Sequence, residues 1–169
     1  MSGVVIRRAS PGDAAALVEL GLGVAAEPEG WLLTDGGWRS AADERRHLKS
    51  LRGSGDAAVF VAEDAAGRLV GRLSVARDTH PAGVHVADLG ILVAADCRRQ
   101  GIGRDLLAAA IAWARGEGVL KLELHVFPHN AAAIALYERH GFVREGLRRG
   151  RYLREGVPVD VVLMALAVS

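Results

Sequence analysis

The sequence is poor in cysteine, lysine and aromatic residues. It has 169 residues and a single cysteine, Cys97, which excludes an internal disulfide framework and a cysteine-based zinc cage. Aromatic residues make up 5% of the chain, and Lys49 and Lys121 are the only lysines, so nearly all of the positive charge is arginine. We interpret the arginine content, like the many alanines, as coding bias without functional meaning.

Net charge and long apolar runs are also missing. Lys and Arg number 21 against 20 Asp and Glu, and a net charge of +1 disfavours a strongly basic nucleic-acid binder. No apolar run reaches the ~18 residues that a membrane span needs. The N-terminus lacks the basic region and apolar core of a secretory signal. We therefore expect a cytoplasmic protein that binds neither nucleic acid nor membrane.

Apolar residues, by contrast, are plentiful. The chain is 50% hydrophobic and 24% charged, which excludes intrinsic disorder. Its length is typical of one domain and suffices to bury about 70% of the unfolded surface without disulfides or metals. We expect residues 1–169 to form a single domain.

The period of the apolar pattern changes repeatedly along the chain. Alternating or β-branched runs predict strands at residues 4–9, 57–63, 68–77, 84–93, 120–126, 142–153 and 157–167. Helical spacing predicts helices opened by Pro11-Gly12-Asp13 and at residues 40–51, 103–116 and 130–140. The order β-α-α-β-β-β-α-β-α-β-β indicates an α/β domain with a mixed sheet.

The strongest chemical signal is the segment ADLGILVAADCRRQGIGRDLL, residues 87–107. An expected strand leads into a polar loop with two glycines, Gly101 and Gly103, and then directly into a helix. Such a junction leaves backbone N–H groups unpaired at a positive helix end, and glycine lets a ligand approach them. Three arginines add charge beside it: Arg98, Arg99 and Arg104. The junction predicts a phosphate site, or alternatively a glycine-assisted turn, and it matches neither a P-loop nor a dinucleotide fingerprint.

Two motifs resemble those of the GCN5-related N-acetyltransferase (GNAT) family. The residues RRQGIG at 98–103, after a strand ending in Ile91-Leu92-Val93, resemble the family's acetyl-CoA motif. Residues 125–142, HVFPHNAAAIALYERHGF, are similar to its Asn…Ala-x-x-Leu-Tyr-x-x-x-Gly-Phe signature. The resemblance covers residues 4–167, with Ala95 where the family often has proline.

The resemblance implies a mixed, mostly antiparallel sheet of about seven strands, with a splayed central parallel pair and about four flanking helices. It implies acetyl-CoA as co-substrate, with no metal, and a pantetheine arm lying between the strands that end at Val93 and Val126. The cofactor-binding residues that it implies are Ile91, Leu92, Val93, Arg98, Arg99, Gln100, Gly101, Ile102, Gly103, Arg104, Asn130 and Tyr137.

The catalytic residues that the resemblance implies are an acid and a base. Tyr137 would place its phenol near the thioester sulfur, and a group with a pKa near ~10 can protonate a thiolate at neutral pH. His125 is the first candidate base, since related ribosomal-protein N-acetyltransferases carry a glutamate at that position. Asp88 and Glu123 are rival bases, and a water path without a dedicated base is a further alternative.

The connection between the first two helices, residues 27–39, contains Trp31 and Trp38 among turn-forming residues. In the family this connection lies over the open end of the cleft. The tryptophans either pin the loop to the core or form a wall of the acceptor pocket, so we take both as candidate substrate-binding residues.

Other residues are given structural interpretations. His125 and His129 are separated by Pro128 and would not share a helical face, which disfavours a zinc site. Cys97 is interpreted as a small loop residue, although nearby amides and arginine could lower its pKa. A run of arginines is interpreted as a solvated strand face. Alternatively, it lines the site of an acidic acceptor or the edge of a homodimer. The residues are Arg144, Arg148, Arg149, Arg151 and Arg154.

The function implied is the transfer of an acetyl group from acetyl-CoA to a primary amine by direct attack in a ternary complex. The acceptor is a small molecule or a peptide or protein N-terminus. Two alternatives stay open: a CoA-binding sensor or partner module without catalysis, and an acyltransferase that uses another donor such as succinyl-CoA.

Overall fold

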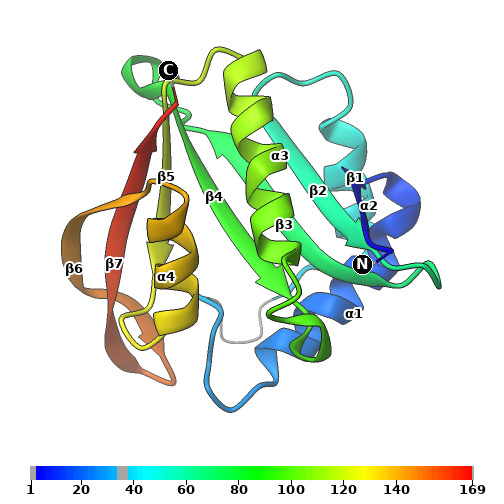
Figure 1. Ribbon diagram of the computed structural model, residues 1–169, viewed down its shortest axis with the longest axis horizontal. Helices are drawn as coiled ribbons and strands as arrows, with labels where there is room; N and C mark the ends of the chain where they lie inside the picture. Colours follow the sequence, from blue (N-terminus) through cyan, green and yellow to red (C-terminus); the bar gives the residue numbers. More distant parts are fainter. Residues whose placement is uncertain (1–2, 34–37, 169) are drawn as a thin grey trace.

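The computed structural model describes residues 3–33 and 38–168, which fold around one seven-stranded sheet of order β1-β2-β3-β4-β5-β7-β6 (Figure 1). The strands are β1 (Val5–Arg8), β2 (Ala57–Glu63), β3 (Leu69–Arg77), β4 (Val86–Val93), β5 (Lys121–Val126), β6 (Val143–Arg154) and β7 (Val157–Ala167). Among the strands of the described residues, β4 and β5 alone pair in parallel, and every other neighbouring pair is antiparallel. The predicted mixed sheet is confirmed.

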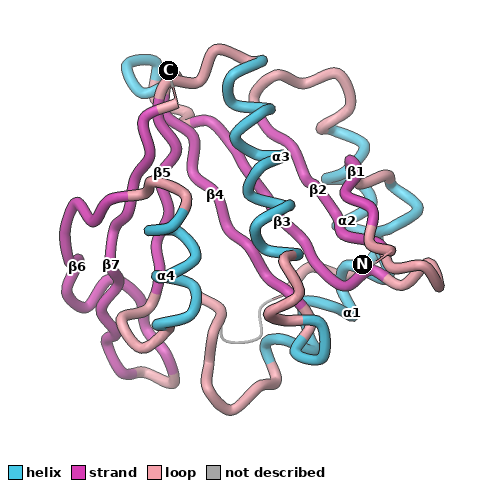
Figure 2. Tube along the Cα trace, in the orientation of Figure 1, coloured by secondary structure: helices cyan, strands magenta, loops and turns pink. Residues whose placement is uncertain are grey.

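Four α-helices cover the two faces of this sheet. They are α1 (Ala14–Ala25), α2 (Ala41–Ser50), α3 (Ile102–Gly116) and α4 (Ala131–Arg139). Helices α3 and α4 lie on one face, and α1 and α2 lie behind the other (Figures 1 and 2). Residues 34–37 of the predicted connection between α1 and α2 lie outside the described residues.

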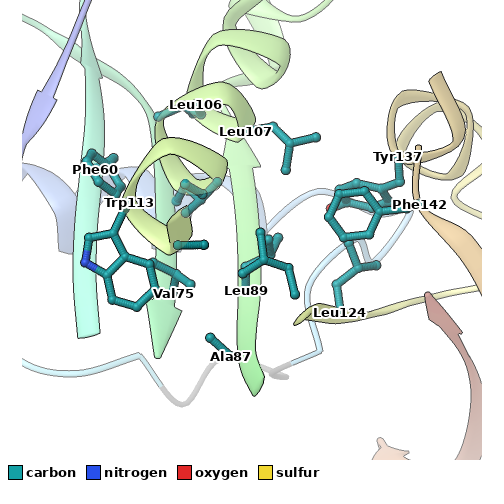
Figure 3. Close-up of a cluster of buried hydrophobic side chains, with 14 of the residues drawn as sticks. Phe60, Val75, Ala87, Leu89, Leu106, Leu107, Trp113, Leu124, Tyr137 and Phe142 are labelled. Atoms are coloured by element: carbon teal, nitrogen blue, oxygen red, sulfur yellow. The ribbon is translucent and has the colours of Figure 1, made fainter. Parts of the chain in front are cut away.

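The alternating strands explain why both faces are covered. In β2, Ala58, Phe60 and Ala62 belong to the larger core that includes α3 and α4. Val59 and Val61 belong to a second core with Leu17 of α1 and Leu48 of α2, which shows the expected two-residue period. Figure 3 shows the larger core, in which Leu106, Leu107 and Trp113 of α3 pack over the sheet.

The central parallel pair is short, and this opens the sheet. Pairing between β4 and β5 begins at Val86 with Lys121 and ends at Asp88 with Glu123. Beyond this point Leu89–Val93 of β4 stays paired with β3, whereas the rest of β5 stays paired with β7. The two strands therefore diverge toward their carboxyl ends, as expected for a splayed central pair.

Candidate active site

The loop between β4 and α3 presents a row of free backbone donors. Helix α3 begins after Gly101, and its first helical hydrogen bond runs from Asp105 N–H to the Gly101 carbonyl at 3.0 Å. Among the described residues, none of the N–H groups of residues 99–104 has a backbone partner. Arg99 (φ 62°) and Gly101 (φ 85°) adopt the left-handed conformation, which makes the backbone concave around these donors. The arrangement suits an anion at the positive end of α3.

The two motif glycines differ in what their missing side chains allow. Gly101 needs its left-handed φ, and a Cβ there would also lie 3.0 Å from the Arg104 guanidinium. A Cβ on Gly103 would lie 2.9 Å from Leu136 of α4. Gly103 therefore permits close packing of α3 against α4, a role that the sequence did not indicate.

Arg98 has other partners than the anion we expected it to face. Its guanidinium forms a two-pronged ion pair with Glu27 at the end of α1, with both N–O distances 2.6 Å. Its Nε donates to the Val93 carbonyl at 3.1 Å. In the structure the charge of Arg98 is thus paired with a carboxylate, and its role beside a phosphate stays a prediction. Arg104, whose side chain is 63% exposed, pairs with its neighbour Asp105 and can turn toward a ligand.

The thiol of Cys97 is not activated in this loop. Arg68 Nη2 lies 3.1 Å from its Sγ, but burial and the Asp96 carboxylate raise the pKa of Cys97. This agrees with the structural interpretation of Cys97 and argues against a lowered pKa.

Tyr137 lies on α4 inside the core that faces α3. Its side chain packs at a ring-centroid distance of 5.7 Å from Phe142, and Figure 3 shows both beside Leu124 of β5. Burial raises the pKa of Tyr137 to about 12. No hydrogen bond from its phenol to another described residue is present, so the O–H remains a free donor.

Asn130 begins α4. Its Oδ1 accepts a hydrogen bond from Ala133 N–H at 3.2 Å, which is the N-cap arrangement. Because this bond uses only the carbonyl side of the amide, the NH₂ group is left to donate to a ligand.

The opposite face of the sheet gathers the candidate bases. Arg72 of β3 faces α2, and Ala76 shares its side of the strand. Asp88 pairs with Ala76, Glu123 pairs with Asp88, and His125 follows two residues along β5. Directly paired residues point to the same side of a sheet. Tyr137 and the base candidates therefore lie on opposite faces, with the splay of β4 and β5 between them.

The two leading base candidates have shifted pKa values. Desolvation by the surrounding protein and the neighbouring Glu123 carboxylate raise the pKa of Asp88. Partial burial, with Arg148 next in effect, lowers the pKa of His125. Its Nδ1 lies 2.9 Å from the hydroxyl oxygen of Tyr152 on β6. A neutral imidazole at neutral pH is a competent proton acceptor.

Trp31 lies against the carboxyl end of β5. It stacks on His129 at 5.5 Å between ring centroids, and His129 in turn stacks on Phe127 at 5.4 Å. Its indole N–H donates to Glu27 at 3.0 Å, so Glu27 joins Trp31 to Arg98. We name residues 27–33 the strap, because they connect the loop after β4 with the residues after β5.

Trp38 has a different environment. Its ring fills the space over Gly21 of α1, where a Cβ would overlap it. The Arg72 guanidinium lies 5.4 Å from its ring centroid on the other side. Trp38 therefore packs between α1 and β3, which favours the pinning interpretation for this residue.

Sequence reasoning missed two residues of the site, Tyr152 and Glu27. Tyr152 lies in an arginine-rich strand, and a bulge between Arg148 and Tyr152 sets the register of this residue against β7. The sequence alone does not show this bulge. Glu27 is 71 positions from Arg98, and no local pattern links them. The only available signal was a lone aromatic residue among arginines.

Comparisons with known proteins identify the class. The model of the Acetyltransferase (GNAT) family matches residues 28–142. An L-amino acid N-acetyltransferase of Escherichia coli is 31% identical over 98% of this chain and 98% of its own. A ribosomal protein bS18-alanine N-acetyltransferase of the same species is 44% identical over 47% of this chain and 53% of its own. The chain belongs to the GNAT family and is an N-acetyltransferase by class.

Solved structures share the fold. A GNAT acetyltransferase from Streptococcus pneumoniae superimposes with a TM-score of 0.89 at 30% identity, over 98% of this chain and 99% of that chain. An acetyltransferase from Salmonella typhimurium, solved with its cofactor acetyl-CoA, has a TM-score of 0.88 at 21% identity, over 99% and 95% of the two chains. Within the described residues, no helix is long and apolar enough to cross a membrane.

Proposed function

We propose that this protein transfers the acetyl group of acetyl-CoA to a primary amine by direct attack in a ternary complex. One observation carries the proposal: the splay beyond Asp88 and Glu123 has a buried phenol on one face and proton acceptors on the other. A thioester in the splay would meet an acid from α4 and an amine from the opposite side.

The residues present fit acetyl-CoA. The free amides of residues 99–103, with Arg104, would hold the diphosphate. The backbone of Ile91–Val93 would add the pantetheine arm as an extra strand, and the Asn130 NH₂ would donate from the other side. The bound co-substrate supplies the activated acetyl group as a thioester.

Tyr137 would protonate the leaving thiolate. With its pKa raised to about 12, the phenol stays protonated at neutral pH and makes no competing hydrogen bond among the described residues. His125 would accept the proton of the attacking amine, and Asp88 or Glu123 would hold an ammonium before its deprotonation.

The acceptor that we propose is an α-amine, either of a free amino acid or of a peptide N-terminus. The E. coli relative that matches over 98% of its length is named for L-amino acids, and the one that matches over 53% of its length is named for the alanine of a ribosomal protein. The two acceptors share the α-amino group and differ in whether the carboxyl is free.

Matched acceptors test this proposal. Release of free CoA thiol is measured with acetyl-CoA and with succinyl-CoA against L-amino acids, their amides, short peptides, the same peptides with blocked N-termini, and a polyamine. We expect acetyl-CoA turnover with at least one α-amine, none with the blocked peptides, and intersecting rather than parallel double-reciprocal lines. Tight CoA binding without turnover would favour a binding module instead.

A further inference from the structure

Tyr152 reaches His125 across an intervening strand. His125 on β5 pairs with Leu163 of β7, whereas Tyr152 on β6 pairs with Val159, four residues away along β7. Neighbouring strands are about 4.8 Å apart, so β5 and β6 lie roughly twice that distance apart across the sheet, and the two residues are also offset along it. The two half-buried side chains nevertheless meet at 2.9 Å between Nδ1 and Oη.

A bulge in β6 aims Tyr152 at this position. Arg148 pairs with Val161 and Tyr152 pairs with Val159, so β6 contains two more residues than β7 between these two pairs. Gly150 takes a φ of 57° inside the bulge, and its N–H donates to the Asp160 carboxylate at 2.7 Å. Bulges re-aim side chains next to functional sites, and this one is fixed by a charged hydrogen bond from the partner strand.

We propose that Tyr152 is a positioning residue: its hydroxyl oxygen accepts a hydrogen bond from the Nδ1–H of His125, which leaves Nε2 as the unprotonated nitrogen. The inference rests on the proposed role of His125 as the base. Which nitrogen of a neutral imidazole carries the proton is set by the hydrogen bond that the other nitrogen makes. If the phenol donated instead, Nε2 would hold the proton and could not take one from an amine.

The proton count favours this direction during the reaction. The amine loses one N–H, Nε2 gains that proton, and the imidazolium then donates from both nitrogens. Tyr152 Oη keeps accepting from Nδ1 throughout, while its own O–H can donate to solvent because the residue is half-buried. Neither side chain has to rotate when His125 gains or loses its second proton. The same holds for other catalytic bases whose orientation is fixed by a third group.

The charges around His125 come from three strands. Arg148 and Arg151 of β6 lower its pKa, and Asp88 of β4 and Glu123 of β5 raise it. Arg151 also lies over the Tyr152 ring, 4.8 Å from its centroid. Burial together with the two arginines outweighs the carboxylates, so the imidazole is neutral at pH 7 and its tautomer decides whether it can act.

Nitrogen NMR of the imidazole tests the hydrogen bond directly. In ¹⁵N-labelled protein above the pKa of His125, we expect Nδ1 to show the shift of a protonated nitrogen and Nε2 that of an unprotonated one. Tyr152→Phe should abolish this preference and lower the pKa of His125, because the imidazolium loses an acceptor. A wild-type imidazole protonated on Nε2, or a tautomer unchanged by Tyr152→Phe, would overturn the proposal.

Kinetics separates positioning from the base assignment itself. With acceptor and acetyl-CoA saturating, Tyr152→Phe should lower kcat roughly threefold to tenfold, the range that one net hydrogen bond represents. It should also move the acidic limb of the pH profile to lower pH. Leu153→Ala, at a neighbouring residue that is 64% exposed, is the matched control and should change neither. If His125→Ala keeps the acidic limb of the wild-type pH profile, His125 is not the base, and Tyr152 then has no role in catalysis through it. The NMR experiment tests the hydrogen bond between the two residues independently of this result.

Discussion

At the scale of single residues, Tyr137 is a buried side chain whose hydroxyl is left free to donate. Tyr137→Phe keeps the ring against Phe142 and removes only the O–H. We expect kcat to fall by roughly 10²–10⁴ with CoA affinity nearly unchanged, because the donor acts on the leaving thiolate. Steady-state kinetics and calorimetry with CoA measure the two quantities. Full activity in this variant would assign the acid role to water or to another group.

Gly101 offers a second test at this scale. In Gly101→Ala the Cβ faces a left-handed φ of 85° and lies 3.0 Å from the Arg104 guanidinium. The left-handed conformation costs a non-glycine residue about 1–2 kcal/mol, so a modest loss of stability is expected. Because the loop would relax away from its concave shape, CoA affinity should fall more than the fold is weakened. Equal affinity for CoA in calorimetry would mean that this loop does not hold the diphosphate.

The residue scale also marks the limit of prediction from sequence. Arg98, Gly101, Asn130 and Tyr137 belong to local motifs, and the resemblance of these motifs to those of the GNAT family singles them out. The partners of such residues lie outside these motifs. Glu27 is 71 positions from Arg98, and the contact between Tyr152 and His125 depends on a two-residue bulge in β6. Motifs indicate which residues bear the chemistry, whereas loop paths and strand register decide what each side chain touches.

At the scale of elements, periodicity together with capping and turn residues predicted every strand and α-helix of the described residues. The predicted strands at residues 57–63 and 157–167 coincide with β2 and β7, and the remaining bounds agree or differ by one to three residues. Three single-turn helices went unpredicted, at Pro11–Asp13, Pro81–Gly83 and Ala95–Cys97. One turn is too short for a 3.6-residue period to repeat, and we expected the first of these to begin α1.

Replacing each of the two tryptophans should affect a different property, stability for Trp38 and acceptor binding for Trp31. Trp38 packs between Gly21 and Arg72, so Trp38→Ala should cost about 3 kcal/mol, near the lower end for such truncations. Trp31 belongs to the strap and stacks on His129. Trp31→Ala should raise the KM for the acceptor, while the KM for acetyl-CoA stays near its original value. Denaturant unfolding and steady-state kinetics measure both variants. The opposite pattern, with Trp31 stabilising and Trp38 selecting the acceptor, would reverse the assignment.

The packing of α2 on the sheet depends on a buried ion pair. Glu44 of α2 is fully buried, and its Oε1 lies 2.9 Å from Arg72 Nη2 on β3. Burial lowers the pKa of Arg72, whereas the Glu44 carboxylate raises it and pairs with the guanidinium. Glu44→Ala should destabilise the protein by about 3–5 kcal/mol, since it leaves a buried charge unpaired.

A double variant is the control for this prediction. Glu44→Leu with Arg72→Met removes both charges together and should restore much of the lost stability, because no unpaired charge is left behind. Denaturant midpoints of the single and double variants supply the comparison. A double variant that loses as much as the separate changes added together would show that packing, and not the charge pair, holds α2 in place.

At the scale of the whole molecule, CoA should stabilise the fold. The ligand would contact β4, α3 and α4, which share one core. A ligand at about 100 times its Kd adds about 2.7 kcal/mol, which for a chain of this size raises Tm by roughly 5–10 °C. Thermal unfolding with and without CoA measures the shift, with pantetheine, which lacks the diphosphate, as the weaker control. An unchanged Tm at saturating CoA would contradict binding across these elements.

The strap has a consequence for anyone who redesigns this enzyme. It is tied to the loop after β4 through Glu27 and Arg98, to His129 through Trp31, and to β6 through Arg154, which donates to the Gly30 carbonyl at 2.6 Å. A grafted segment that lacks Glu27 and Trp31 would have neither the ion pair with Arg98 nor the stacking on His129. Transplants should therefore carry Glu27 and Trp31 with them, or replace Arg98 in the same step, since a swap of the loop alone leaves Arg98 without its carboxylate partner.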